Sequence, residues 1–402
     1  MVHTIQFGGI KGRNLTDAHA HLSNQFHHHK HTLLSLDYQK CFDNTHPRLI
    51  LEIFRRAGLP PHLTGLLSHV WEHQQRYIQL GTAVDPHHTT VSTSLPQGDA
   101  LCPAAINILL SAAARHIQNT FGHNITQVLF IDDRNLLCSS VDTLTEAHKL
   151  WNHWSTLFTL QENTTKTSIT TANTAHHKQL LQRTYTQHIQ PYTRVLGIDL
   201  QQNRNHISPT ATKRWHDAHR IAHRLRTAPI SWADKQHYWR TLILGKATWG
   251  WLYKQPPATV TKLFNQHYRL LFPGQKGGSR ALTTLLAGHS NDFNFRHNIF
   301  TWRAFRRAYT STGGLPPHDP WNKRIHHWLQ QLKWTNIAPH TWTHHDLPPL
   351  RLHDDTNLQD HLIRESWRRN LFADFIRSTR RDAQHLRDWH YNEHSTATAR
   401  KL

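Results

Sequence analysis

The chain has 402 residues and a formal net charge of +20, before any of its 39 histidines is protonated. That balance favours a polyanionic partner, above all nucleic acid, over a protein that is merely basic and soluble. The three cysteines have no CxxC spacing, which argues against a zinc knuckle and against a disulfide framework. With no signal peptide and no apolar run of about 18 residues, the sequence predicts no secretion and no membrane span, but an intracellular protein of the nucleus or cytoplasm.

Ahead of residue 94 the pattern predicts one strand, three helices and a β-hairpin. Thr16 and Asp17 are suitable N-cap residues for the first helix. The strand is an apolar run that ends in the carboxylate of Asp37. Asn44 and Thr45 supply a capping side chain for the next helix, and Pro47 lies near its start. These elements are expected at residues 16–26, 32–43, 47–58, 62–73, and 76–80 paired with 89–93.

A polar loop and an apolar helix follow. Residues 94–103 read SLPQGDALCP, which places Gln97 and Gly98 in a glycine turn that opens the helix. The helix is expected from Pro103 through about His116 and is apolar nearly all round. Such a helix should be buried against a sheet, so its pattern indicates packing rather than function.

Two adjacent carboxylates lie at the tip of a predicted hairpin, residues 127–138, which read QVLFIDDRNLLC. A paired acid is costly to bury without positive charge, so a solvent-exposed turn is the plainer interpretation of Asp132 and Asp133. If the strand that ends in Asp37 lies beside this hairpin, however, Asp37 and Asp132 can face each other at one edge of a sheet. Carboxylates placed in this way suit a pair of Mg²⁺ ions about 4 Å apart.

The remaining sequence is expected to be mainly helical and increasingly basic. A long amphipathic helix is predicted over residues 144–158, and the segments QENTTKT at 161–167 and RVLGIDL at 194–200 follow it. Beyond about residue 205, helices with arginines on their outer faces alternate with linkers, one of them at 273–279, and a last helical stretch covers about 358–389. Arginines interleaved with Trp and Phe suit phosphate contact and base stacking, although a solvated helix face would look the same.

The order of these segments resembles the motifs of reverse transcriptases, and most of all those of non-LTR (LINE-type) retrotransposons. LDYQKCFD, SLPQGDALCP and FIDDRN are similar to the palm motifs A, B and C, and QENTTKT and RVLGIDL are similar to motifs D and E. Residues 6–13, QFGGIKGR, resemble the fingers motif that precedes motif A. Six motifs in the right order form a specific signal, which covers roughly residues 5–200, half of the chain.

The resemblance implies an α+β fold. It comprises a polymerase palm, in which an antiparallel sheet carries helices on one face, with partial fingers, a helical thumb and a helical C-terminal region. Because relatives have further fingers strands ahead of the first motif, the chain is expected to be truncated at its N-terminus. The implied domains are partial fingers at 1–31, palm at 32–203, thumb at 204–272 and a basic helical C-terminal extension at 273–402.

The resemblance also implies an activity: RNA-directed DNA polymerisation, in which dNTPs are added to a primer 3′-hydroxyl with two Mg²⁺ ions, or with Mn²⁺. The partners would be an RNA template, a DNA primer and dNTPs, with no membrane involved, and the pattern gives no oligomeric state. By matching position, Asp37, Asp132 and Asp133 would hold the metals, and Lys166 would act as proton donor or charge partner. Phe42 would be the steric gate, and Gln97, Gly98, Lys11 and Arg13 would contact dNTP or template. Leu196 and Gly197 would form the primer grip, with Gly197 turning the hairpin that holds the primer.

Two other interpretations stay open at this point. The chain can be an inactive, truncated retroelement fragment that folds as palm and thumb without polymerising. It can also be a basic protein that binds nucleic acid through its C-terminal half. The acidic residues of the motifs would then be inherited from a polymerase ancestor. Salt-dependent binding without Mg²⁺-dependent primer extension would favour this last interpretation.

Overall fold

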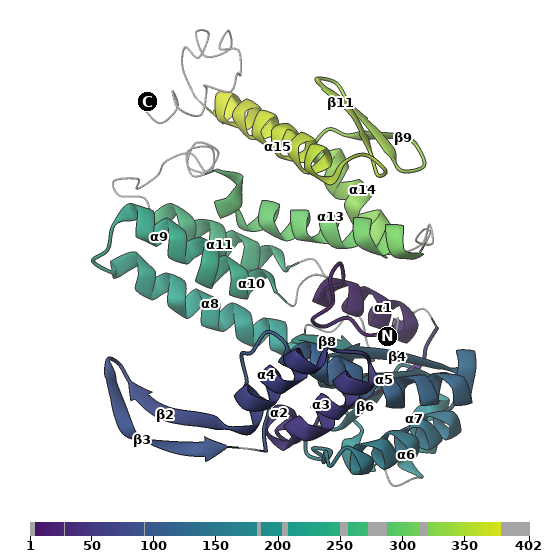
Figure 1. Cartoon of the computed structure of the whole chain (residues 1–402). Coiled ribbons are helices and arrows are strands. Elements are labelled where there is room, and N and C mark those ends of the chain that lie inside the picture. Colours follow the sequence, from purple (N-terminus) through teal and green to yellow (C-terminus); the bar gives the residue numbers. More distant parts are fainter. Residues whose placement is uncertain are drawn as a thin grey trace. The chain divides into compact units, whose positions relative to one another are not determined.

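The computed structural model describes residues 5–27, 29–91, 93–182, 186–202, 208–249, 256–271, 288–312 and 320–378. The chain divides into two compact units, Met1–His206 and Ile207–Leu402 (Figure 1). It is a mixture of helices and sheets, as expected. Among the described helices, none is long and apolar enough to cross a membrane.

A four-stranded antiparallel sheet forms the centre of the first unit, in the order β4-β5-β1-β6. The hairpin β4–β5 is closed by the pair Phe130 and Asp133, as the sequence predicts. Leu36 at the end of β1 pairs with Arg134 on β5, so the antiparallel register places Asp37 across from Asp133. The strands are β1 (Thr32–Leu36), β4 (Ile125–Phe130), β5 (Asp133–Cys138) and β6 (Ser168–Thr171).

Elements cover both faces of this sheet, which corrects the expectation of helices on one face alone. The helices α5 (Cys102–Phe121) and α6 (Val141–Leu157) share one core with side chains such as Leu34 and Leu136. The opposite face carries Leu33, Val128 and Leu137, which are buried under α1 (Leu15–His27) and the hairpin of β7 (Tyr192–Val195) and β8 (Ile198–Gln201) (Figure 1). The strands are apolar on both sides, and each side needs a cover.

Short elements connect β1 to α5. The first of them, the helix α2 (Cys41–Asn44), corrects the predicted extent of the first strand, which ends at Leu36 and not at residue 43, because the chain turns at Lys40 with a φ of 47°. The other elements lie close to where the sequence predicts them. They are α3 (Pro47–Arg56), α4 (Pro61–Glu72), β2 (Gln74–Leu80) and β3 (Ala83–Val91), and the remaining short elements of this unit are η1 (Gly122–Asn124), α7 (Thr174–Leu181) and η2 (Thr186–His188). Two caps differ from expectation by a few residues. Asn14, rather than Thr16 or Asp17, accepts the first N–H groups of α1 with its side chain, and His46 does so for α3.

The second unit begins with a helical group whose core contains Trp239, Phe264 and Phe293. The basic outer face predicted for its first helix comprises Arg214, Arg220, Arg224 and Arg226. The last three are exposed as expected, whereas Arg214 is half-buried. The helices of the unit are α8 (Pro209–Thr227), α9 (Trp232–Tyr238), the π-helical η3 (Trp239–Leu244), α10 (Gly245–Thr248), α11 (Ala258–Leu270), η4 (His289–Asn291), α13 (Phe293–Thr312), α14 (Pro320–Gln331) and α15 (Thr356–Ser378).

The C-terminal region is not purely helical, which corrects a second expectation. A three-stranded sheet of β9 (Thr335–Ala338), β10 (Thr341–His344) and β11 (Leu347–Arg351) precedes α15. On β10, Trp342 and His344 are buried while the two threonines between and before them are half-buried, a short period-2 pattern that the prediction overlooked. The predicted linker at 273–279 and the end of the last helix, beyond residue 378, lie outside the described residues.

Candidate active site

The carboxylate of Asp132 is presented by a tight turn with a strained backbone. Ile131 and Asp132 form the two-residue loop between β4 and β5, and Ile131 has a φ of 59°. A β-branched residue rarely adopts this left-handed conformation, which costs about 1–3 kcal/mol unless neighbours hold it in place. The turn is therefore held by its surroundings and not by its own conformational preference.

The N-terminal segment supplies that support. Its backbone runs along β4, where the Phe7 N–H donates to Leu129 O at 2.8 Å and the Leu129 N–H donates to Ile5 O at 3.0 Å. Gly8 lies directly against the turn, because a Cβ at this position would be 2.7 Å from Cγ1 of Ile131 and 2.8 Å from its nitrogen. The Asn107 side chain on α5 donates to Gly8 O at 2.7 Å. Any side chain at position 8 would thus displace the loop that carries Asp132.

Asp37 forms an ion pair with Lys166, and the two side chains differ strongly in exposure. Lys166 Nζ lies 2.7 Å from Asp37 Oδ2, with 67% of the lysine side chain exposed against 20% of the aspartate side chain. Lys166 lies on a turn that follows Asn163, whose N–H donates to Asp37 O at 2.9 Å. The hydrogen bond and ion pair with Asp37, together with the nearby Asp133 and Asp132, raise the pKa of Lys166. The ammonium therefore stays charged beside the acids.

The two acids of the hairpin are held in a partly desolvated place. Burial is the main cause that raises the pKa of Asp132, and the charge of Asp37 adds to it. Burial also raises the pKa of Asp133 to about 6, with further contributions from Asp132 and then Asp37. Carboxylates that oppose one another's ionisation in this way would be stabilised by an added cation.

Arg134 is a charged residue of this site that the sequence prediction passed over as part of a strand. Its side chain is fully buried, with the guanidinium carbon 3.4 Å from the ring centroid of Tyr38. Nη2 donates to Asp37 O at 3.2 Å, while Nε and Nη1 have no hydrogen-bond partner. Burial lowers the pKa of Arg134, and the charges of Tyr38, Glu162 and Asp37 oppose that effect. The backbone oxygen of Asp37 thus accepts hydrogen bonds from two separate segments, from Arg134 on β5 and from Asn163 ahead of the Lys166 turn.

The predicted nucleotide contacts lie on elements outside this acid cluster. Phe42 on α2 is partly buried against the core of the unit, and its oxygen accepts from the Leu95 N–H at 2.9 Å. Gln97 and Gly98 are exposed on the loop before α5, where Gly98 has a φ of 101°. Asp99 holds this loop in place, since its carboxylate accepts from Trp71 Nε1 at 3.0 Å and from the Leu101 N–H at 2.7 Å.

The remaining predicted residues lie on two other segments. Lys11 is exposed, whereas Arg13 turns back on its own segment, with Nη1 2.6 Å from Gln6 O. Leu196 and Gly197 form the turn of β7–β8 with φ values of 51° and 81°, so Gly197 turns the hairpin as expected. The buried ring of His19 on α1 faces the backbone of this turn, and burial lowers its pKa to about 4.

The chemistry of the acid cluster fits a hard divalent cation. Among the described residues, no three His, Cys, Asp or Glu side chains are arranged as a ready metal site. Mg²⁺ is commonly bound by one or two carboxylates together with water and substrate phosphates, and an all-protein cage is not required. Asp37, Asp132 and Asp133 would supply such oxygens, and their unfavourable mutual repulsion is the observation that favours a cation there. The three cysteines are free and buried, which agrees with the absence of a predicted disulfide framework.

Residues 1–206, just over half of the chain, match the family described as reverse transcriptase (RNA-dependent DNA polymerase). No curated protein matches the chain. Among solved structures it is similar to apo telomerase from Candida tropicalis, with 8% identity, a TM-score of 0.41 and coverage of 81% of this chain and 57% of that one. It is also similar to telomerase with a TWJ fragment of telomeric RNA from Candida tropicalis (10% identity, TM-score 0.38, coverage 82% and 53%) and from Candida albicans (11%, 0.32, 83% and 56%). The chain thus spans little more than half the length of these telomerase chains.

Proposed function

Since the chain belongs to the reverse transcriptase (RNA-dependent DNA polymerase) family, we propose that it extends a DNA primer on an RNA template by adding dNTPs to the primer 3′-hydroxyl. The observation that carries the proposal is the convergence of Asp37, Asp132 and Asp133 at one edge of the sheet, with Lys166 beside them. These carboxylates come from strands about a hundred residues apart in the chain, and folding brings together acids that repel one another.

Each residue of the cluster has a distinct task in this proposal. Two Mg²⁺ ions, or Mn²⁺, when bound there, would lower the pKa of the primer hydroxyl and balance the charge on the departing pyrophosphate. Asp37 and Asp132 would provide oxygen ligands, and Asp133 would support the pair. Lys166 has an exposed side chain, and its ammonium would leave Asp37 and pair with the phosphates of the incoming nucleotide. There it would also be able to donate a proton.

The finer assignments are part of the same proposal. The first unit would be a palm with partial fingers, and the second would begin with a thumb, in a chain derived from a non-LTR retrotransposon. Phe42 would exclude a ribose 2′-hydroxyl. Gln97, Gly98, Lys11 and Arg13 would contact dNTP or template, while Leu196 and Gly197 would hold the primer end.

A second candidate function rests on the exposed arginines of α8. Arg220, Arg224 and Arg226 all face solvent in a chain of net charge +20, which suits phosphate contacts along a nucleic acid strand. In this alternative the chain binds nucleic acid without polymerising. The two candidates differ in whether Mg²⁺-dependent incorporation accompanies salt-dependent binding.

Primer extension on poly(A)/oligo(dT) with Mg²⁺ or Mn²⁺ tests the polymerase proposal. We expect incorporation by the wild type and a loss of at least about a thousandfold in Asp37→Asn and in Asp132→Asn, because each removes a carboxylate that would bind metal. Salt-dependent binding of the template–primer should persist in both variants. Glu146→Gln is the matched control, since Glu146 is 59% exposed in a surface pair with Lys149. Equal incorporation by the aspartate variants and the control would refute the assignment.

A further inference from the structure

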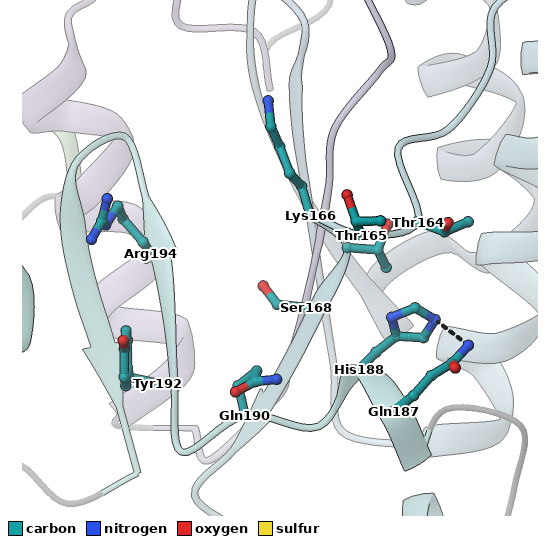
Figure 2. A pocket seen from close by; sticks show the side chains of 10 residues that line it. Thr164, Thr165, Lys166, Ser168, Gln187, His188, Gln190, Tyr192 and Arg194 are labelled. Atoms are coloured by element: carbon teal, nitrogen blue, oxygen red, sulfur yellow. Dashed lines mark hydrogen bonds between the residues drawn. The ribbon is translucent and has the colours of Figure 1, made fainter.

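The hairpin of β2 and β3 projects from the helices of the first unit, with most of its side chains in solvent (Figure 1). Four of its apolar side chains are exposed, from 50% for Tyr77 to 85% for Leu80. The polar cavity in Figure 2, by contrast, adjoins the candidate active site, because Lys166 lines it and also contacts Asp37. The hairpin is therefore a separate apolar surface that the proposed polymerase chemistry does not use.

Strand β2 has a second edge that is open to pairing. Among the described strands it pairs with β3 alone, so its other edge faces no strand. A two-stranded hairpin is only marginally stable by itself, and an exposed apolar edge is a template for a further strand. β2 reads QQRYIQL, which has no proline and a single charge, that of Arg76. All seven of its residues are thus able to pair with another strand.

The free edge of β3 is much less suited to pairing. Between Tyr77 and Gln79, β2 advances by two residues while the paired residues on β3 advance by four. The extra residues form a bulge that contains Pro86, which has no N–H to donate. Bulges and prolines are common devices that prevent an edge from pairing. A further strand would therefore join the hairpin on its β2 side.

The sequence of β2 is complementary to a second copy of itself. Tyr77 is the midpoint of its seven residues, so a two-fold axis at Tyr77 pairs all of them in antiparallel register. Gln75 then lies across from the partner's Gln79, where the two amides can hydrogen-bond each other. Arg76 lies across from the partner's Ile78 and not from a second arginine. This register keeps like charges apart and leaves no residue of β2 unpaired.

Charge also favours a second copy over nucleic acid at this surface. Residues 74–91 contain one arginine and one aspartate, so with neutral histidines the hairpin has no net charge in a chain of +20. A neutral hairpin lacks the positive charge that attracts phosphates. Two strongly basic copies repel each other least where their surfaces are neutral.

We propose that the chain self-associates through β2, which pairs with β2 of a second copy to form a four-stranded sheet in the order β3-β2-β2-β3. Seven-residue strands bury less surface than a permanent dimer interface, so the association is reversible, with a Kd of roughly 1–100 µM. This self-association is independent of the polymerase activity, because β2 contributes no residue to the acid cluster.

Sedimentation equilibrium of the full chain, freed of nucleic acid, measures the association. Residue 78 lies across from the partner's Arg76, so Ile78→Lys adds two repulsive pairs to each dimer and Ile78→Glu adds two attractive pairs. We expect the Kd of Ile78→Lys to be at least about tenfold higher than that of Ile78→Glu. Val84→Lys is the matched control, because it adds the same charge at an exposed position on β3, and its Kd should stay near that of the wild type. Ile78 is 74% exposed, so neither substitution should change the melting temperature of the monomer.

A cysteine at the two-fold axis tests the register covalently. Tyr77→Cys places two thiols across from each other and should give a disulfide-linked dimer on mild oxidation. Gln79→Cys is the control and should give none, because position 79 lies across from the partner's Gln75. The native cysteines Cys41, Cys102 and Cys138 are buried and should not react.

Two results would overturn the proposal. A wild type that is still monomeric at about 300 µM would leave the β2 edge to a strand of another protein. Equal Kd values for Ile78→Lys and Ile78→Glu, with equal cross-linking of the two cysteine variants, would show that any dimer forms through a different surface. Neither measurement needs Mg²⁺, dNTPs or turnover, so the outcome of primer extension does not affect it.

Discussion

Two clusters of charged side chains, one in each unit, differ in how far the charge of their partly buried carboxylates is compensated. In the second unit, Asp360 on α15 has a side chain only 12% exposed and is surrounded by arginines. Arg303 donates to it from Nε at 2.9 Å and from Nη2 at 2.5 Å, while Arg306 and Arg364 lie 3.9 Å and 3.6 Å away. The protein itself neutralises this carboxylate, so it has no need of an external cation.

In the first unit the carboxylates outnumber the cations beside them. Three carboxylates share the largely exposed ammonium of Lys166 and a buried guanidinium that bonds only a backbone oxygen among them. Folding has left negative charge uncompensated at the edge of the sheet. The comparison teaches that acids surrounded by arginines stabilise the fold, whereas acids that oppose one another are available to an added cation.

The largest effect on stability is expected from Asp360→Asn. The change leaves Arg303, Arg306 and Arg364 around a neutral amide, which should destabilise the second unit by about 2–4 kcal/mol, somewhat below the loss of a fully buried pair because Arg303 is one third exposed. Denaturant unfolding of the full chain measures it. Asp217→Asn, which removes a surface carboxylate paired with Arg220 and Lys246, is the control and should change little. Equal losses in the two variants would contradict the comparison.

Asp133→Asn should have the opposite effect and stabilise the fold. The folded-state pKa of Asp133 is about 6, above its ordinary value of 3.8, so the folded chain retains a proton that the unfolded chain loses. This contribution to stability is complete below about pH 4 and is lost as the pH rises through 6. Asparagine stays neutral, and the variant should therefore be more stable than the wild type by up to about 3 kcal/mol at pH 7 and by little at pH 4.

Thermal melting at the two pH values, with and without Mg²⁺, tests this expectation. Added Mg²⁺ should raise the melting temperature of the wild type more than that of Asp133→Asn, because the variant has lost a carboxylate oxygen. A variant that is less stable than the wild type at pH 7 would show that Asp133 is compensated within the fold, as Asp360 is.

Local pattern was enough to predict the main parts of the site. The hairpin with two acids at its tip, the strand ending in Asp37 and the turn at Gly197 each follow from a few neighbouring residues, and the structure has all three. The strand register that sets Asp37 opposite Asp133 depends on residues about a hundred positions apart, and the sequence could only suggest it conditionally.

Other features depend on tertiary packing that local periodicity does not encode. The strand residues Leu33 and Leu34 are both apolar, so nothing in their order says that α1 covers one face and α5 the other. The sheet β9–β11 has strands of four or five residues, too short for a firm period-2 signal. Gly8 and Arg134 owe their importance to contacts with distant segments, with the Ile131 turn in one case and with Tyr38 and Asp37 in the other.

Arg134→Met should have the smallest effect on stability and a larger one on activity. Two nitrogens of the buried guanidinium lack hydrogen-bond partners, so exchanging it for an apolar side chain of similar length should change the free energy of unfolding by no more than about 1 kcal/mol. The Asp37 backbone oxygen would lose one of its donors, and the acids would lose a nearby positive charge that lowers the pKa of Asp133. We therefore expect primer extension to fall about tenfold or more and its pH profile to move toward higher pH.

Arg134→Lys keeps the charge without the planar stacking on Tyr38, so its pH profile should stay near that of the wild type. An unshifted profile in Arg134→Met would mean that Arg134 serves the packing of the sheet and not the electrostatics of the acids.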